Sequence, residues 1–194
     1  MLLKSNNYDH LYKSFKWNIP SYFNIATSTI DKKEYQNRTA LIDVLDNGKI
    51  QNWSFADIKK YSNKLANVFD HFQLDSDARV GIVLGQCPET AISHMACFKT
   101  GRISIPLFNL FGVEALYYRL MNSRASVVIC DQMGLDKIKE IFHNIKNITD
   151  IIKLEEHGTT ILHDPKLVKL YNIIPPLKKL DYMVGMENIK HQIF

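Results

Sequence analysis

The sequence predicts an α/β fold: a partial doubly wound, mostly parallel sheet followed by a small helical tail. Between Arg79 and Leu154, short apolar runs alternate with segments whose apolar residues have helical spacing. Strands joined by helices pair in parallel through right-handed crossovers, with helices on both faces of the sheet. The run RVGIVL at 79–84 is almost wholly apolar, as a strand covered on both faces requires. Such sheets place their ligands beyond the carboxyl ends of the strands.

Local signals mark where several elements begin and end. Asn47-Gly48 accepts positive φ and predicts a hairpin turn. Ser54, followed three residues later by Asp57, has the spacing of a capping box at a helix N-terminus. Pro88 opens a helix and Gly101 closes it. The elements predicted in order are a hairpin (40–45 and 49–55), a helix to residue 72, a strand (79–84), a helix (88–99), a strand (103–107), a helix (114–122), a strand (126–130), a helix (135–145) and a strand (150–154).

Composition excludes several classes of protein. The chain has 194 residues, of which 46% are hydrophobic and 23% charged, so it is neither disordered nor collagen-like. The net charge is +4 and the basic residues form no cluster along the sequence, so we expect no nucleic-acid partner. No apolar run approaches the roughly 18 residues of a membrane span. Cys87, Cys97 and Cys130 form no CxxC pair and the histidines no HExxH motif, so we expect no disulfide framework, no metal site and a cytoplasmic location.

The amino-acid composition of the sequence changes after Glu155. Turn-forming and polar residues fill the next stretch, and Pro175-Pro176 precedes a short helical pattern. We therefore predict a first domain at 1–154, a linker or junction at 155–165 and a helical tail at 166–194. The apolar series of this tail reaches Phe194 without a stop signal, so we expect a truncated segment.

The region from Tyr22 to Ile141 resembles the N-terminal subdomain of adenylate-forming enzymes, specifically AMP-dependent acyl-CoA synthetases. The family's motifs occur here in order, among them S-N-x-L-A-N in a helix and A-L-x-Y-R-L in a later helix, and Asp77-Ala78-Arg79-Val80 stands where the family usually reads D-R-V. The stretches that carry the resemblance are FNIATSTIDK (23–32), WSFADIKKYSNKLANVF (53–69), DARVGIVLGQCPETAISHMACFKTG (77–101) and IPLFNLFGVEALYYRLMNSRASVVI (105–129).

This resemblance implies an acid–thiol ligase that uses ATP, Mg²⁺ and CoA. In the family, a carboxylic acid attacks the α-phosphate of ATP to give an acyl-adenylate and pyrophosphate, and CoA then displaces AMP. Phe108, Phe111 and Gly112 lie, by the resemblance, on the loop toward the acyl and CoA side of the site. The alternative is that they serve turn geometry and packing, with Gly112 letting the backbone turn into the next helix. Pro106 predicts a strand end or an edge strand, and Arg119 can pair with a carboxylate or carbonyl.

The sequence departs from the family pattern at three positions. Gly85 stands where proline is usual, Arg102 where a small residue is common, and Arg124 where the S-G-A turn has glycine. If that turn requires positive φ, Arg124 costs about 1 kcal/mol. These departures leave the predicted fold intact.

The chemistry of the family also needs a phosphate loop, a ribose-binding aspartate and a C-terminal lysine, and the sequence has no match to them. Residues 157–160, followed by Pro165-Lys166, resemble part of the phosphate loop. The second glycine of that loop is missing, however, and the gap before Pro165 is too long. We interpret this stretch as turn and linker. No catalytic residue is assigned, and we expect the chain to be the N-terminal part of an acyl-CoA synthetase, inactive by itself.

The tail has a second resemblance. Val184-Gly185-Met186 and Ile189-Lys190 are similar to the segment ahead of the nucleotide loop in AAA-type ATPases. An ordinary amphipathic helix explains them equally well. Two further hypotheses stay open, a non-catalytic acyl- or CoA-binding module and an adaptor associated with an AAA ATPase. The acid substrate, its chain length and the oligomeric state cannot be predicted from this sequence.

Overall fold

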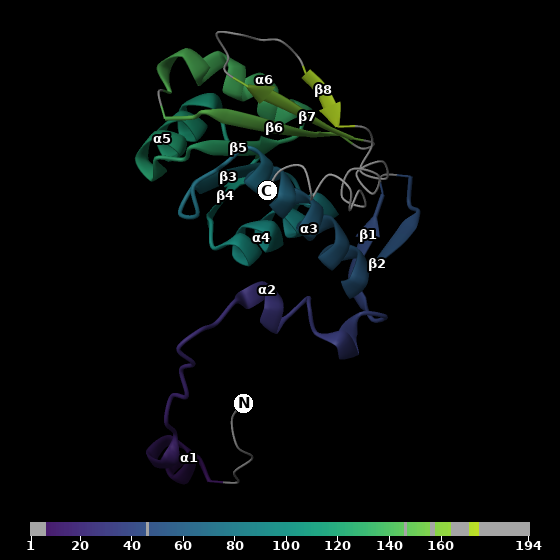
Figure 1. Ribbon diagram of the computed structural model, residues 1–194, viewed down its shortest axis with the longest axis vertical. Coiled ribbons are helices and arrows are strands. Elements are labelled where there is room, and N and C mark those ends of the chain that lie inside the picture. Colours follow the sequence, from purple (N-terminus) through teal and green to yellow (C-terminus); the bar gives the residue numbers. More distant parts are fainter. Residues whose placement is uncertain (1–6, 46, 146, 156–157, 164–170, 175–194) are drawn as a thin grey trace, which may run out of the picture.

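A six-stranded sheet forms the body of the protein in the computed structural model (Figure 1), which describes residues 7–45, 47–145, 147–155, 158–163 and 171–174. Its strand order is β4-β3-β5-β6-β7-β8. The first four strands in this order pair in parallel, and β7 and β8 extend the sheet in antiparallel fashion. The predicted α/β class with a mostly parallel sheet is therefore confirmed. The strands are β3 (Arg79–Leu84), β4 (Ile103–Phe108), β5 (Val127–Cys130), β6 (Asp150–Glu155), β7 (Gly158–His163) and β8 (Tyr171–Ile174).

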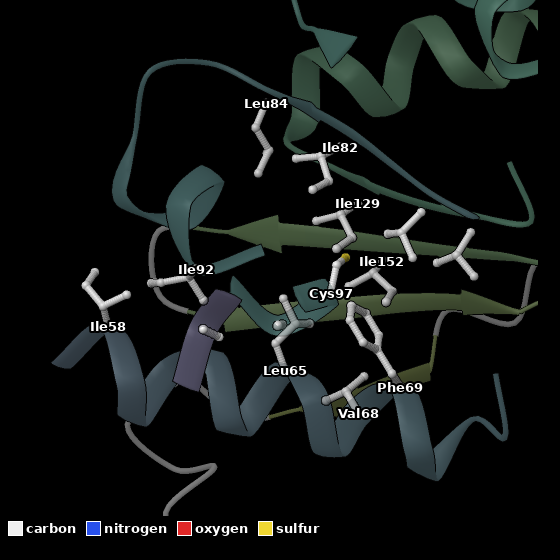
Figure 2. Close-up of a cluster of buried hydrophobic side chains, with 14 of the residues drawn as sticks. Ile58, Leu65, Val68, Phe69, Ile82, Leu84, Ile92, Cys97, Ile129 and Ile152 are labelled. Carbon is white, nitrogen blue, oxygen red and sulfur yellow. The ribbon is translucent and has the colours of Figure 1, made fainter. Parts of the chain in front are cut away.

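Two buried clusters, one on each face of the sheet, form the core. The first joins α3 (Phe55–His71) and α4 (Pro88–Thr100) to the sheet, and Figure 2 shows Ile82 and Ile129 of the strands with Leu65 and Phe69 of α3 in this cluster. The second joins α5 (Val113–Ser123) and α6 (Gln132–Ile141) to the opposite face. Alternate residues of β3, β5 and β6 enter different clusters, because successive side chains point to opposite faces. Burial on both faces explains the nearly continuous apolar strands.

Capping residues define the ends of the main helices. The Ser54 hydroxyl accepts from the Asp57 amide at 3.1 Å, and the Asp57 carboxylate accepts from the Ser54 amide at 2.9 Å, so the predicted capping box is present. Gly101 closes α4 at a φ of 78°. The helix predicted at 135–145 instead begins at residue 132, because the carboxylate of Asp131 accepts from the Gly134 amide at 2.7 Å. A one-turn 3-10 helix, η2 (Phe142–Asn144), follows α6.

The N-terminal region is peripheral to this sheet. The predicted hairpin is confirmed as β1 (Thr39–Val44) and β2 (Ile50–Ser54), preceded by α1 (Tyr8–Ser14), α2 (Ile25–Ser28) and η1 (Lys33–Tyr35). The short helix α1 has no buried residue and lies away from the body in Figure 1. In contrast, Asn24 caps α2 and donates from Nδ2 to the carbonyl of Phe98 at 2.7 Å, so the protein's packed body begins near residue 24.

The structure corrects the expectations for parts of the C-terminal region. Residues 158–163, predicted as turn and linker, form β7, which pairs with β6 from Glu155↔Gly158 to Asp150↔His163. Residues 171–174 of the predicted helical tail form β8. Both segments contain β-branched residues, which suit strands, and our linker interpretation gave the turn formers too much weight. Pro165-Lys166 and residues 175–194, including the motif that resembles AAA-type ATPases, lie outside the described residues.

Two further expectations concern single positions. Arg124 has a φ of 54° and a ψ of 41° at the end of α5, so the condition under which this arginine costs about 1 kcal/mol is met. Pro106 lies on β4, the edge strand of the sheet, as its missing N–H predicts. Within the part of the chain that the structure describes, no helix combines the length and hydrophobicity needed to cross a bilayer.

Candidate ligand site at the carboxyl ends of the strands

Two loops leave the same end of the parallel sheet. Strands β3 and β4 pair in register, with Leu84 opposite Phe108, so the residues that follow each strand emerge side by side. Strand β5 pairs with the other side of β3, and Asp131 follows its last residue, Cys130, which lies opposite Val83. This edge is where parallel α/β sheets place their ligands.

The structure brings together the two aromatic rings predicted for the loop between β4 and α5. The Phe108 and Phe111 rings meet edge to face, with centroids 6.5 Å apart and an interplanar angle of 86°. A turn closes between them, because the Phe111 amide donates to the Phe108 carbonyl at 3.0 Å. Phe111 packs against the second core cluster, whereas Phe108 is 39% exposed. Phe108 therefore presents an aromatic surface to solvent beside a ring that is anchored in the core.

Gly112 also lies on this loop, at the N-cap of α5, but its predicted conformational role is wrong. Its φ of −66° is open to every residue, and no atom lies within 4 Å of the position of an added Cβ. The turn into α5 therefore does not need glycine. An exposed Gly112 instead leaves the loop surface free of a side chain next to Phe111.

Arg119 adds a positive charge to the aromatic pair. Its guanidinium carbon lies 4.2 Å from the centroid of the Phe111 ring, a cation–π distance, and Nη1 donates to the Ala115 carbonyl at 3.2 Å. The predicted pairing of Arg119 with a carbonyl is thus confirmed. The stacking on Phe111 was not predicted, because periodicity says which helix face a residue occupies and not which loop folds back over it.

The first two turns of α6 fasten the same loop. The Asn109 amide donates from Nδ2 to Oδ2 of Asp131 at 3.0 Å. The Lys137 ammonium donates to the carbonyl oxygens of Asn109 at 2.5 Å and of Phe111 at 3.0 Å. A Cβ at Gly85 would lie 3.1 Å from Nδ2 of Asn109, so the glycine found here in place of the family's usual proline leaves room for this side chain. None of these contacts was predicted.

The loop between β3 and α4 contributes the thiol of Cys87, and the first turn of α4 contributes the hydroxyl of Thr90. The Thr90 hydroxyl donates to the Gly85 carbonyl at 2.7 Å and lies 3.4 Å from the sulfur of Cys87. Burial raises the pKa of the Cys87 thiol above its ordinary value, so the thiol is protonated near pH 7 and is a weak nucleophile. The three cysteines are free, and the described residues contain no group of three or more His, Cys, Asp or Glu residues placed to hold a metal ion.

The sequence matches the AMP-binding enzyme family over residues 30–177. The chain belongs to this family. The match extends over the whole described sheet, and it confirms the family that the motifs of the β3–α4 and β4–α5 regions resemble. Similarity to AAA-type ATPases in the tail stays a prediction.

The relatives that the chain resembles are named as acyl-CoA synthetases. It is 28% identical over 161 residues to the mitochondrial acyl-coenzyme A synthetase ACSM3 of Rattus norvegicus, covering 79% of this chain and 28% of the relative. It is 30% identical over 151 residues to the acetyl-coenzyme A synthetase of Cryptosporidium parvum, covering 75% of this chain and 22% of the relative. The chain thus spans less than a third of the length of these relatives.

Solved structures show the same fold. The Brucella canis acyl-CoA synthetase superposes with a TM-score of 0.67 at 21% identity, covering 76% of this chain and 28% of that one. The anthranilate CoA ligase AuaEII, solved with anthranoyl-AMP, superposes with a TM-score of 0.63 at 22% identity, covering 70% of this chain and 26% of that one. The described sheet and helices therefore have the architecture of the corresponding part of adenylate-forming ligases.

Proposed function

We propose that this chain is the N-terminal part of an acyl-CoA synthetase, which joins a carboxylic acid to CoA and converts ATP to AMP and pyrophosphate. The observation that supports this most is the family match over residues 30–177, together with the similarity to relatives named as acyl-CoA and acetyl-CoA synthetases. A cytoplasmic location stays a prediction, and so does a domain boundary within 155–165, although β7 continues the sheet from β6 across part of that stretch.

Within this function, the loop between β4 and α5 contributes to the acyl and CoA side of the site. The exposed ring of Phe108 offers an apolar face, and Arg119, stacked on Phe111, offers a guanidinium that suits a phosphate. The exposed backbone at Gly112 lets a ligand approach without a clash. ATP and Mg²⁺ belong to the family reaction, but the described residues contain no cluster that fits the metal, so no step of adenylation is assigned to them.

We further propose that the 194-residue chain forms no acyl-adenylate by itself. Its sequence lacks the phosphate loop and the C-terminal lysine that the family reaction uses. The test is pyrophosphate release from ATP with a panel of short-chain and fatty acids, with the Brucella canis enzyme as a positive control. We expect release at the level of the no-acid blank, and turnover clearly above that blank would contradict the proposal.

A non-catalytic acyl- or CoA-binding module is the second candidate, since the loop that carries Phe108 and Phe111 is fastened within the described part of the chain. Calorimetric titration of the chain with CoA and acyl-CoAs separates the two candidates. Saturable binding without pyrophosphate release favours the module. An adaptor for an AAA ATPase is a third possibility, and it rests only on Val184-Gly185-Met186 and Ile189-Lys190, outside the described residues.

A further inference from the structure

We propose that Lys137 is a positioning residue that holds the loop between β4 and α5 in the shape that binds the acyl or CoA ligand. This inference rests on the proposed function of that loop. Lys137 lies on α6, 26 residues after Phe111 in the sequence, and touches the loop only through its side chain.

The contacts of Lys137 fix the backbone of the loop. Its ammonium donates to two carbonyl oxygens of the same turn, at 2.5 Å from Asn109 and 3.0 Å from Phe111. Both carbonyls must point toward α6 for this to occur, so two peptide planes of the loop are oriented by one cation. A hydrogen bond from a charged donor is roughly twice as strong as a neutral one.

The side chain of Asn109 is held from the same helix, which gives the loop a second attachment. Its Nδ2 donates to Oδ2 of Asp131, while Oδ1 of Asp131 accepts from the Gly134 amide. Asp131 is therefore fixed as the cap of α6. Lys137 lies one to two helical turns after Asp131 on α6, and it holds the other end of the loop, near Phe111.

The orientation of this turn decides where the proposed ligand-binding groups lie. The Phe111 ring supports the guanidinium of Arg119 at 4.2 Å and the Phe108 ring at a centroid distance of 6.5 Å. If the Phe111 peptide rotated freely, both neighbours would lose a defined position. A loop that is ordered before the ligand arrives spares the entropy of ordering it on binding.

Helix α6 does not depend on Lys137 for its own packing. Leu135, Ile138 and Ile141 bury one face of the helix in the second core cluster. Lys137 is half-buried and is not part of that cluster. Replacement by methionine keeps an unbranched apolar stem and removes the charged ammonium with its three donors, so we expect the fold to persist.

The experiment compares Lys137→Met, Lys137→Arg and a matched control, Lys139→Met. Lys139 lies on the same helix, is 60% exposed, and approaches Asp136 only at 3.9 Å, so its replacement removes an equal charge without touching the loop. Amide hydrogen exchange of residues 109–112 reports the order of the loop, with strands β3 and β5 as internal references. Calorimetric titration with CoA reports binding.

In Lys137→Met we expect exchange at the Phe111 amide to rise about tenfold and affinity for CoA to fall about fivefold to tenfold. Lys139→Met should match the wild type within about twofold in both measurements. Lys137→Arg retains a charged donor and should recover most of the protection and affinity.

Each of the other outcomes overturns one part of the proposal. Unchanged exchange in Lys137→Met shows that the residue does not hold the loop. Raised exchange with unchanged CoA affinity shows a structural contact without a positioning role. If the wild type itself does not bind CoA at millimolar concentration, the loop binds no CoA in this chain and the positioning role is overturned, while exchange still decides whether Lys137 holds the loop.

Discussion

Two lysines fasten distant segments in different ways, Lys99 on the face of the sheet covered by α3 and α4, and Lys137 on the opposite face. The ammonium of Lys99 lies 3.0 Å from Oδ1 of Asp31 and 2.5 Å from Oδ1 of Asn63, and only 10% of its side chain is exposed. Burial lowers the pKa of Lys99 below its usual value, and the nearby Asp31 opposes that shift. Lys137 is half-buried, and its two loop partners are neutral carbonyl oxygens.

This difference separates a contact that holds the fold from one that shapes a loop. Lys99 joins α4 to α3 and to the segment around Asp31, 68 residues earlier in the sequence, and that segment packs on α4. Removing Lys99 leaves a carboxylate and an amide without their cation at a point where three segments meet. Removing Lys137 frees carbonyls that water can reach at the loop, so the effect should stay local.

The largest effect should follow Lys99→Met. Breaking a fully buried ion pair costs about 3–5 kcal/mol, and we expect about 2 kcal/mol here because Asp31 is 24% exposed. Lys137→Met should lower the free energy of unfolding by only about 1 kcal/mol, the size that a roughly tenfold rise in loop exchange implies. Urea denaturation followed by circular dichroism measures both.

The double variant Asp31→Asn/Lys99→Met provides the control for the ion pair. It should recover part of the loss, since no carboxylate is then left without its cation. Equal destabilisation by Lys99→Met and Lys137→Met would end the distinction between the two lysines.

A gain of stability should follow Arg124→Gly, on the face where Lys137 lies. Arg124 has a φ of 54°, in the left-handed region, where glycine avoids a steric cost of about 1 kcal/mol. We expect a gain of about 0.5–1 kcal/mol in urea denaturation. The gain should be the same in the wild-type and Lys137→Met backgrounds, because the structure describes no contact between Lys137 and Arg124. A loss of stability would show that the Arg124 side chain contributes more than its backbone costs.

The smallest effect is a pH dependence on the face where Lys99 lies. Burial lowers the pKa of His94 below 6.5, and its Nδ1 lies 2.7 Å from the Ser104 hydroxyl. Between this lowered pKa and 6.5 the unfolded chain binds more protons than the folded one, so stability falls as the pH falls through that interval and levels off below it.

His94→Gln should remove this component. The measurement is the difference in urea midpoint between wild type and variant at several pH values from about 7.5 to 5. A constant difference across this range would show that His94 has the same pKa in both states.

Local patterns predicted the sheet and most of its helices. A strand that is buried on two faces needs an apolar run such as RVGIVL at 79–84, and a capped helix needs a pair of residues such as Ser54 and Asp57. The edge position of Pro106 was also readable, since proline changes the backbone at its own position, whereas the left-handed turn at Arg124 was indicated only by the glycine usual there in the family. The carboxyl-end loop could be placed, and its two aromatic rings do meet.

The contacts that order the candidate site could not be predicted in this way. Lys137 reaches Asn109 across 28 residues, and nothing in the spacing of α6 distinguishes it from the exposed Lys139. Asn109 and Asp131 follow strands that are not neighbours, with β3 between them, so their meeting depends on the strand order. Gly112 was misjudged because glycine is also used where its conformational freedom is not needed.

The edge position of Pro106 bears on how the protein behaves at high concentration. Strand β4 ends the sheet, and its outer side carries backbone groups that a strand from another molecule could pair with. Proline in the middle of this strand cannot donate a hydrogen bond, and its ring hinders the approach of a further strand. Pro106 should therefore disfavour, along this edge, the strand-by-strand addition of further molecules that leads to fibres.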